Sequence, residues 1–75
     1  MQKIININKN ILGGTPVFQG TRVPIKNLLD YIEGGETIDD FLKGFPSVTK
    51  KQVLELLEKA GKVITSEKFI HEDIN

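Results

Sequence analysis

The sequence contains no cysteine, no tryptophan, a single histidine and no long apolar run. Without cysteine the chain can form neither a disulfide nor a thiolate zinc site. No apolar stretch approaches the roughly 18 residues that a membrane-spanning helix needs. The opening residues 1–6 are too polar for the core of a signal peptide. We therefore expect a cytoplasmic protein that does not associate with membranes.

The length of 75 residues allows one domain, because a second hydrophobic core would have nothing to fill it. Apolar residues make up 39% of the chain, and ten basic side chains balance ten acidic ones, which is typical of a folded protein. A domain of this size is only marginally stable by itself. Tight helix packing or a partner chain must therefore support it.

The charges are distributed unevenly along the chain. Residues 1–26 carry four basic side chains and no acidic one, whereas residues 27–49 carry five acidic side chains and one lysine. We favour a solvated surface whose two poles attract one another or a second copy. The other interpretation is a basic edge that faces phosphate groups.

Two short strands are predicted before the helices begin. Ile4–Ile7 is rich in β-branched residues, and Thr15–Phe18 follows the chain break at Gly13-Gly14. Pro16 confines the second strand to a sheet edge or to a strand start. A ribbon of two strands is marginal in water, so we expect it to lie against the helices.

The periodicity becomes helical at Pro24, which suits the first helical position. The first helix is expected to end in a left-handed cap at Gly34-Gly35. Thr37 and Asp40 form an approximate capping box for a second helix, which Pro46 stops. The apolar faces predicted to be buried are Ile25, Leu28, Leu29 and Ile32, then Ile38, Phe41, Leu42 and Phe45.

A third helix is predicted after Thr49, which forms a full capping box with Gln52. Val48 and Val53 form the accompanying hydrophobic staple. Two ion pairs are expected on its solvent-exposed face, Lys51 with Glu55 and Glu58 with Lys62. Its predicted buried side comprises Val53, Leu54, Leu57, Ala60 and Ile64, with Leu56 and Val63 at the margins. Residues 1–64 are therefore predicted to form the domain and residues 65–75 a tail.

Little in the sequence supports catalysis. His71 lies in the tail beside Glu72 and Asp73, where a solvated role is typical. The segment Gly13-Gly14 lacks the lysine and the spacing of a phosphate-binding loop. We expect no enzyme activity, no metal and no cofactor.

The segment 13–25, Gly-Gly-Thr-Pro-Val-Phe-Gln-Gly-Thr-Arg-Val-Pro-Ile, resembles the opening motif of a bacterial family known as domain-of-unknown-function family 433. The resemblance continues through the Phe45-Pro46 turn and covers about residues 4–64. It implies a mainly α fold, with a three-helix homeodomain-like or winged helix-turn-helix core and a short N-terminal β-ribbon. Members are often dimeric. They are regarded as VapB-like antitoxins encoded beside a PIN-like nuclease toxin.

The same helices are also compatible with a plain three-helix bundle, because no single helix-turn-helix register fits all the apolar offsets. Glu55 and Glu58 follow the opening of the third helix and would repel phosphate. Arg22 has two interpretations: a structural clamp between ribbon and helices, which we favour, and a phosphate contact. The candidate DNA-binding residues are Lys3, Lys9, Arg22, Lys26, Thr49, Lys50, Lys51 and Gln52.

The tail offers three apolar anchors for a partner protein, Phe69, Ile70 and Ile74. They could order on binding, or Phe69 and Ile70 could pack back on the domain or across a dimer. We expect an antitoxin-like homodimer that neutralises a nuclease-like toxin and contacts its own operator DNA. The alternative is a protein-interaction or dimerisation module that does not bind DNA.

Overall fold

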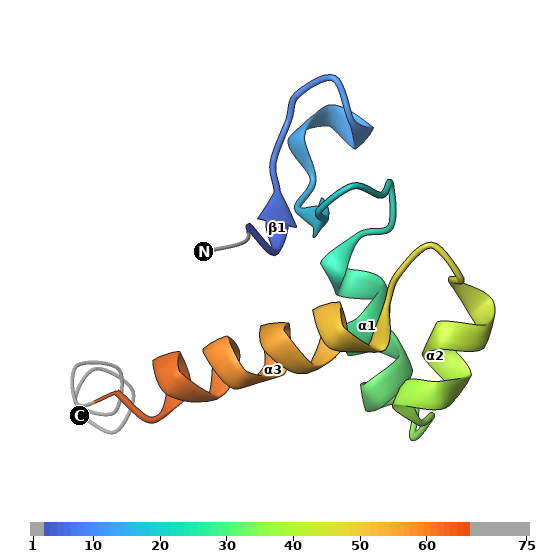
Figure 1. Ribbon diagram of the computed structural model, residues 1–75, viewed down its shortest axis with the longest axis vertical. Coiled ribbons are helices and arrows are strands. Elements are labelled where there is room, and N and C mark those ends of the chain that lie inside the picture. The colour runs from blue at the N-terminus through green and yellow to red at the C-terminus, as the bar shows by residue number, and fades with distance from the viewer. Residues whose placement is uncertain (1–2, 67–75) are drawn as a thin grey trace.

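A short antiparallel ribbon leads into three helices in the computed structural model, which describes residues 3–66 (Figure 1). Strand β1 (Ile5–Asn6) pairs with strand β2 (Val17–Phe18), and Ile5 lies opposite Phe18. Both strands are shorter than the predicted segments. The chain leaves the sheet at Ile7, whose side chain is exposed, and enters the loop that joins the strands.

The loop between the strands contains a left-handed turn, the short 3-10 segment η1 (Leu12–Gly14). Three successive residues have positive φ values: 48° at Leu12, 65° at Gly13 and 92° at Gly14. Glycine adopts this backbone conformation at no steric cost, whereas leucine does not. The predicted chain break at Gly13-Gly14 is thus confirmed, and Leu12 is strained.

Helix α1 (Ile25–Glu33) begins one residue later than predicted, because Pro24 has an extended backbone and is the N-cap. The helix ends at the glycine pair Gly34-Gly35, as predicted. The Gly35 N–H donates to the Ile32 carbonyl at 3.0 Å, and the Glu36 N–H donates to the Tyr31 carbonyl at 2.9 Å. These two bonds and the positive φ of Gly35 define a Schellman motif.

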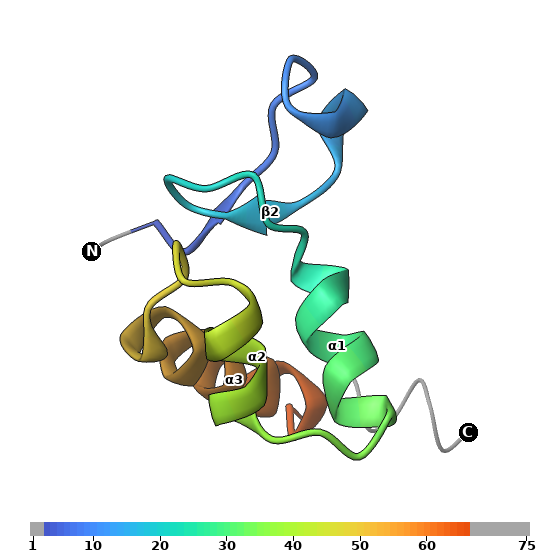
Figure 2. The ribbon, with the colours of Figure 1, turned by 90° about the vertical axis from the view of Figure 1, so that its right-hand side faces the viewer.

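Helices α2 (Ile38–Gly44) and α3 (Lys50–Ile64) each begin with the predicted capping box. At α2 the Asp40 N–H donates to Thr37 Oγ1, and the Thr37 N–H donates to Asp40 Oδ2, both at 3.1 Å. At α3 the Gln52 N–H donates to Thr49 Oγ1 at 3.1 Å, and the Thr49 N–H donates to Gln52 Oε1 at 2.9 Å. Figure 2 shows the ribbon above the helices, with α1 beside α2 and α3 behind.

The core forms where the ribbon, the three helices and the turn before α3 converge. Aromatic rings join these elements: the ring centroids lie 5.9 Å apart for Phe18 and Phe41, 5.5 Å for Tyr31 and Phe41, and 5.0 Å for Phe41 and Phe45. Phe41 therefore links β2, α1 and the end of α2. The buried core cluster comprises Phe18, Leu28, Phe41, Val48 and Val53, so both residues of the predicted staple are buried.

Parts of two predicted helix faces are wrong. In α1, Leu29 and Ile32 are 48% and 43% exposed, and Tyr31 packs against the core instead. In α3, Leu54 and Ile64 are exposed, whereas Leu56 packs inward. A helical period locates an apolar stripe, but the neighbouring elements decide which flank of that stripe is covered.

Residues 67–75 lie outside the described part of the chain, and with them lie His71 and the predicted anchors Phe69, Ile70 and Ile74. Within residues 3–66, no helix is long and apolar enough to cross a membrane.

Candidate functional site

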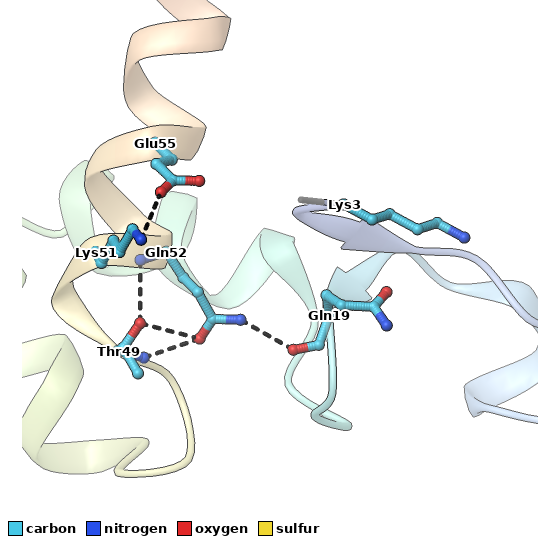
Figure 3. Close-up of a pocket in the computed structure, with 6 residues that line it drawn as sticks. All are labelled: Lys3, Gln19, Thr49, Lys51, Gln52 and Glu55. Atoms are coloured by element: carbon cyan, nitrogen blue, oxygen red, sulfur yellow. Dashed lines mark hydrogen bonds and ion pairs between the residues drawn. The ribbon is translucent and has the colours of Figure 1, made fainter. Parts of the chain in front are cut away.

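The ribbon and the first turn of α3 are joined through one side-chain amide. Gln52 Nε2 donates to the Gln19 carbonyl at 2.9 Å, while Gln52 Oε1 accepts the Thr49 N–H of the capping box (Figure 3). The same amide therefore caps α3 and holds the turn that follows β2. These two roles fix the position of the ribbon relative to the third helix.

An open polar pocket of about 440 Å³ lies at this junction. Its charged groups are two lysines and one carboxylate. Lys51 pairs with Glu55 at 3.8 Å, and Lys3 extends away from Thr49 (Figure 3). This arrangement can donate hydrogen bonds to an anionic partner, and its one carboxylate, Glu55, is paired with Lys51. The pocket is lined by Lys3, Gln19, Thr49, Lys51, Gln52 and Glu55.

The structure brings together half of the candidate DNA-binding residues. Lys3, Thr49, Lys51 and Gln52 line the polar pocket, and Gln19 joins them from the ribbon turn. No local sequence signal could have identified Gln19, because its contact with Gln52 spans 33 positions. The remaining candidates do not line this pocket: Lys9 in the loop, Arg22 before α1, Lys26 on α1 and Lys50 at the start of α3.

Lys26 and Arg22, two of the candidates outside the pocket, have surroundings that differ from those predicted. The Lys26 Nζ lies 3.0 and 3.2 Å from the two carboxylate oxygens of Asp30, so its charge is partly neutralised. The favoured structural role of Arg22 is wrong for the described residues. Arg22 is exposed, and within residues 3–66 no hydrogen bond or ion pair engages it. Gln52 provides the link between ribbon and helix that we expected from Arg22.

A second hollow, with a volume of about 340 Å³, continues along α3 beyond the polar pocket. It lies between β1 and the C-terminal half of α3, and apart from Lys59 its lining is apolar. Ile5 is 36% exposed and Val63 is 60% exposed. We call this surface the apolar groove; it comprises Ile5, Leu56, Lys59, Ala60, Val63 and Ile64. The helical period predicts Leu56 and Val63 at the margin of the buried face, and no sequence pattern connects them with Ile5.

The acidic middle of the chain forms a capping site in α2. Hydrogen bonds from the backbone and the side chain of Thr37, with the charge of Lys43 nearby, lower the pKa of Asp40 below its ordinary value. Between residues 3 and 66, no three acidic or histidine side chains gather where they could hold a metal ion. We conclude that Asp40 serves the stability of α2.

The fold defines a small helical domain with an N-terminal ribbon, and its two candidate surfaces both lie along α3. The chain belongs to the family described as "Protein of unknown function (DUF433)", which matches residues 5–58. It is also similar to the uncharacterized protein y4eO of Sinorhizobium fredii, with 33% identity over 52 residues. That match covers 69% of this chain but only 24% of the relative. No solved structure matches the chain.

Proposed function

We propose that the chain is the antitoxin-like component of a toxin–antitoxin pair. It acts in the cytoplasm as a homodimer without enzyme activity of its own, and it binds and neutralises a nuclease-like protein encoded nearby. The support is the family motif at residues 13–25 together with the apolar side chains that are exposed on α1 and along α3.

The exposed apolar side chains are the main support for the protein-binding part of this proposal. Within residues 3–66, eight large apolar side chains are exposed, whereas seven apolar residues form the buried core. A contiguous apolar patch marks a surface that a partner covers, and two such patches are present in the described part of the chain: Leu29 with Ile32, one turn apart on α1, and the apolar groove. The exposed residues lie on more than one element: Ile5, Ile7, Leu12, Leu29, Ile32, Leu54, Val63 and Ile64.

Two regions are assigned to the nuclease-like partner. One is the exposed pair Leu29 and Ile32 on α1. The other is the predicted set of anchors Phe69, Ile70 and Ile74, which lies outside the described residues. Apolar anchors of this kind contribute most when a partner buries them completely.

The operator-binding part of the proposal places DNA at the polar pocket. We assign a homeodomain-like, winged helix-turn-helix arrangement, in which α2, the turn at residues 45–49 and α3 form the motif and the ribbon forms the wing. Lys3 and Lys51 line that pocket, and Lys51 lies in the first turn of α3. Phosphate oxygens accept hydrogen bonds from such side chains.

Co-expression with the protein encoded by the neighbouring gene tests the protein-binding part. The two proteins should co-purify, and the neighbour should arrest growth only when this chain is missing. A neighbour that is harmless alone and does not co-purify would exclude the antitoxin function. The matched variants are Leu29→Glu, which should weaken co-purification, and Lys43→Glu, an exposed site on α2 that should not.

A gel shift with the chain's own promoter region tests the operator part separately. We expect a complex that weakens as salt increases, since phosphate contacts release counterions. The double substitution Lys3→Ala, Lys51→Ala removes the two lysines that line the pocket and should reduce the salt dependence, by about one unit of slope for each phosphate that the variant no longer neutralises. Lys26→Ala is the matched control, because Lys26 lies on α1 and does not line the pocket.

Two observations favour a second candidate, a protein-interaction or dimerisation module that does not bind DNA. Glu55 lines the polar pocket and would face the phosphates, while the whole chain has no net charge. This candidate predicts co-purification with a protein partner but no salt-sensitive complex with promoter DNA.

A further inference from the structure

The width of the two-stranded sheet is much smaller than the length of helix α3 beside it. Helix α3 has 15 residues and is therefore about 22 Å long. Two strands cover only about 10 Å at the usual strand spacing. In Figure 1 the C-terminal half of α3 extends past β1, on the side away from β2. The apolar groove marks where the helix begins to extend beyond the sheet.

The outer edge of β1 presents backbone groups beside the groove. The Gln19 N–H donates to the Ile4 carbonyl, while the Phe18 N–H donates to Val23 instead of to β1. Hydrogen bonds to an antiparallel neighbour alternate along a strand. The N–H and the C=O of Ile5 therefore both point away from β2, where another strand could bind them.

We propose that β1 of a second copy of this chain pairs with β1 in antiparallel orientation, above the C-terminal half of α3. A two-fold axis at Ile5 lets the N–H of each copy donate to the C=O of the other, so one residue supplies both halves of the contact. The four strands β2–β1–β1–β2 would span about 19 Å, which matches the length of α3.

Three features favour a second copy of the chain as the partner that pairs with β1 and covers the apolar groove. The exposed edge belongs to a ribbon with two residues in each strand, which is too short for independent stability. Each copy brings the apolar Ile5 to the groove of the other, where Val63 and Ile64 are more than half exposed. Gly61 has open space where a side chain would lie, so this region of α3 has no tight neighbour within residues 3–66.

This inference rests on the homodimer clause of the proposed function and is independent of the toxin and DNA clauses. Sedimentation equilibrium of the isolated full chain tests it, without any nuclease or DNA present. The wild type should have twice the 8.4 kDa chain mass. Val63→Glu should raise the dimer dissociation constant roughly 30-fold or more, because it replaces an apolar contact with a carboxylate that must lose its hydration in the interface.

A second variant addresses the strand pairing itself. Ile5→Pro removes the outward N–H but no hydrogen bond to β2, and should raise the dissociation constant roughly tenfold, since two symmetric bonds are lost. Leu54→Glu is the matched control on α3, because Leu54 is exposed and does not line the groove, and it should leave the constant unchanged. Circular dichroism of each variant verifies that the helices persist.

Nuclear Overhauser effects in a mixture of labelled and unlabelled chains identify the occupant directly. Antiparallel pairing about Ile5 should give intermolecular effects between Ile4 of one copy and Asn6 of the other. A wild type that remains monomeric would overturn the inference. A dimer that resists both Val63→Glu and Ile5→Pro, or intramolecular effects alone at the groove, would overturn it as well. A dimer that fails to capture the nuclease would contradict the proposed function and leave this inference standing.

Discussion

Gln52 and Gln19 are 33 residues apart in the sequence, yet Gln52 Nε2 donates to the Gln19 carbonyl at 2.9 Å. The oxygen of the same amide accepts the Thr49 N–H at the start of α3. One planar group thus connects a local helix cap to the ribbon. The ribbon is also held by the buried side chains of Val17 and Phe18 and by the bond from the Ile25 N–H to the Pro16 carbonyl. The Gln52 amide adds a direct bond to α3.

Gln52→Glu separates the two roles of this side chain. A glutamate still accepts the Thr49 N–H, but it cannot donate to the Gln19 carbonyl. We expect the free energy of unfolding to decrease by about 0.5–1.5 kcal/mol, the usual net value of one hydrogen bond. Urea denaturation provides the measurement, and hydrogen exchange at residues 17–19 should become faster.

Thr49→Ala is the control for the cap alone. It removes the hydroxyl that accepts the Gln52 N–H and should cost about 1 kcal/mol. Hydrogen exchange in the ribbon should change less than in Gln52→Glu. Equal ribbon protection in Gln52→Glu and in the wild type would show that the Gln52–Gln19 bond contributes nothing to ribbon position.

Leu12→Gly should stabilise the protein. Leu12 has a φ of 48° and is 47% exposed, so it has a strained backbone and little burial in return. Relief of a left-handed conformation contributes about 1 kcal/mol, partly offset by the greater freedom of glycine in the unfolded chain. Thermal unfolding measures the change. Leu12→Ala keeps the strain while shortening the side chain, and an equal gain there would exclude the backbone explanation.

The free energy of unfolding should decrease at acidic pH, because Asp40 in the capping box of α2 becomes protonated. Folding lowers the pKa of Asp40, chiefly through the hydrogen bond from the Thr37 backbone. Its ionised form therefore contributes stability above the ordinary aspartate pKa of about 3.9, and that contribution is lost as the pH falls through the lower folded value. In urea titrations, Asp40→Asn should be less stable than the wild type at neutral pH, with the difference shrinking in acid. Asp39→Asn, in the same turn, is the matched control for stability at neutral pH, because Asp39 is not part of the capping box.

Features set by near neighbours in the sequence were predictable. The capping boxes at Thr37 and Thr49, the Schellman end of α1 and two ion pairs of α3 all join residues within five positions of one another. Short-range chemistry determines each of them, so residue type and spacing are sufficient evidence. Half of the predicted DNA surface likewise comes together because three of its residues share the first turn of α3.

Features set by distant neighbours could not be predicted in this way. Helical periodicity could not reveal that Tyr31 would turn inward and leave Leu29 exposed, because that depends on the rings of Phe41 and Phe45. Helical periodicity also could not show that Ile5 and the C-terminal half of α3 line the same groove. Arg22 was assigned a structural role because of its many donors, yet a neutral amide provides the link.

Gly44 and Tyr31 provide a test of how closely α1 and α2 approach. A methyl group on Gly44 would lie 2.9 Å from Tyr31 Oη, closer than ordinary contact. The Tyr31 ring packs against Phe41 and Phe45 and has little room to withdraw. Gly44→Ala should therefore destabilise the domain by about 1–3 kcal/mol despite the better helix propensity of alanine.

The hydroxyl group alone creates this conflict, so Tyr31→Phe should relieve it. In the Tyr31→Phe background, Gly44→Ala should be neutral or should stabilise the domain by up to about 1 kcal/mol, since alanine favours the helix and nothing opposes it. A double-mutant cycle by urea denaturation measures the coupling, which should exceed about 1 kcal/mol. Additive effects of the two substitutions would show that α1 and α2 do not meet at this contact.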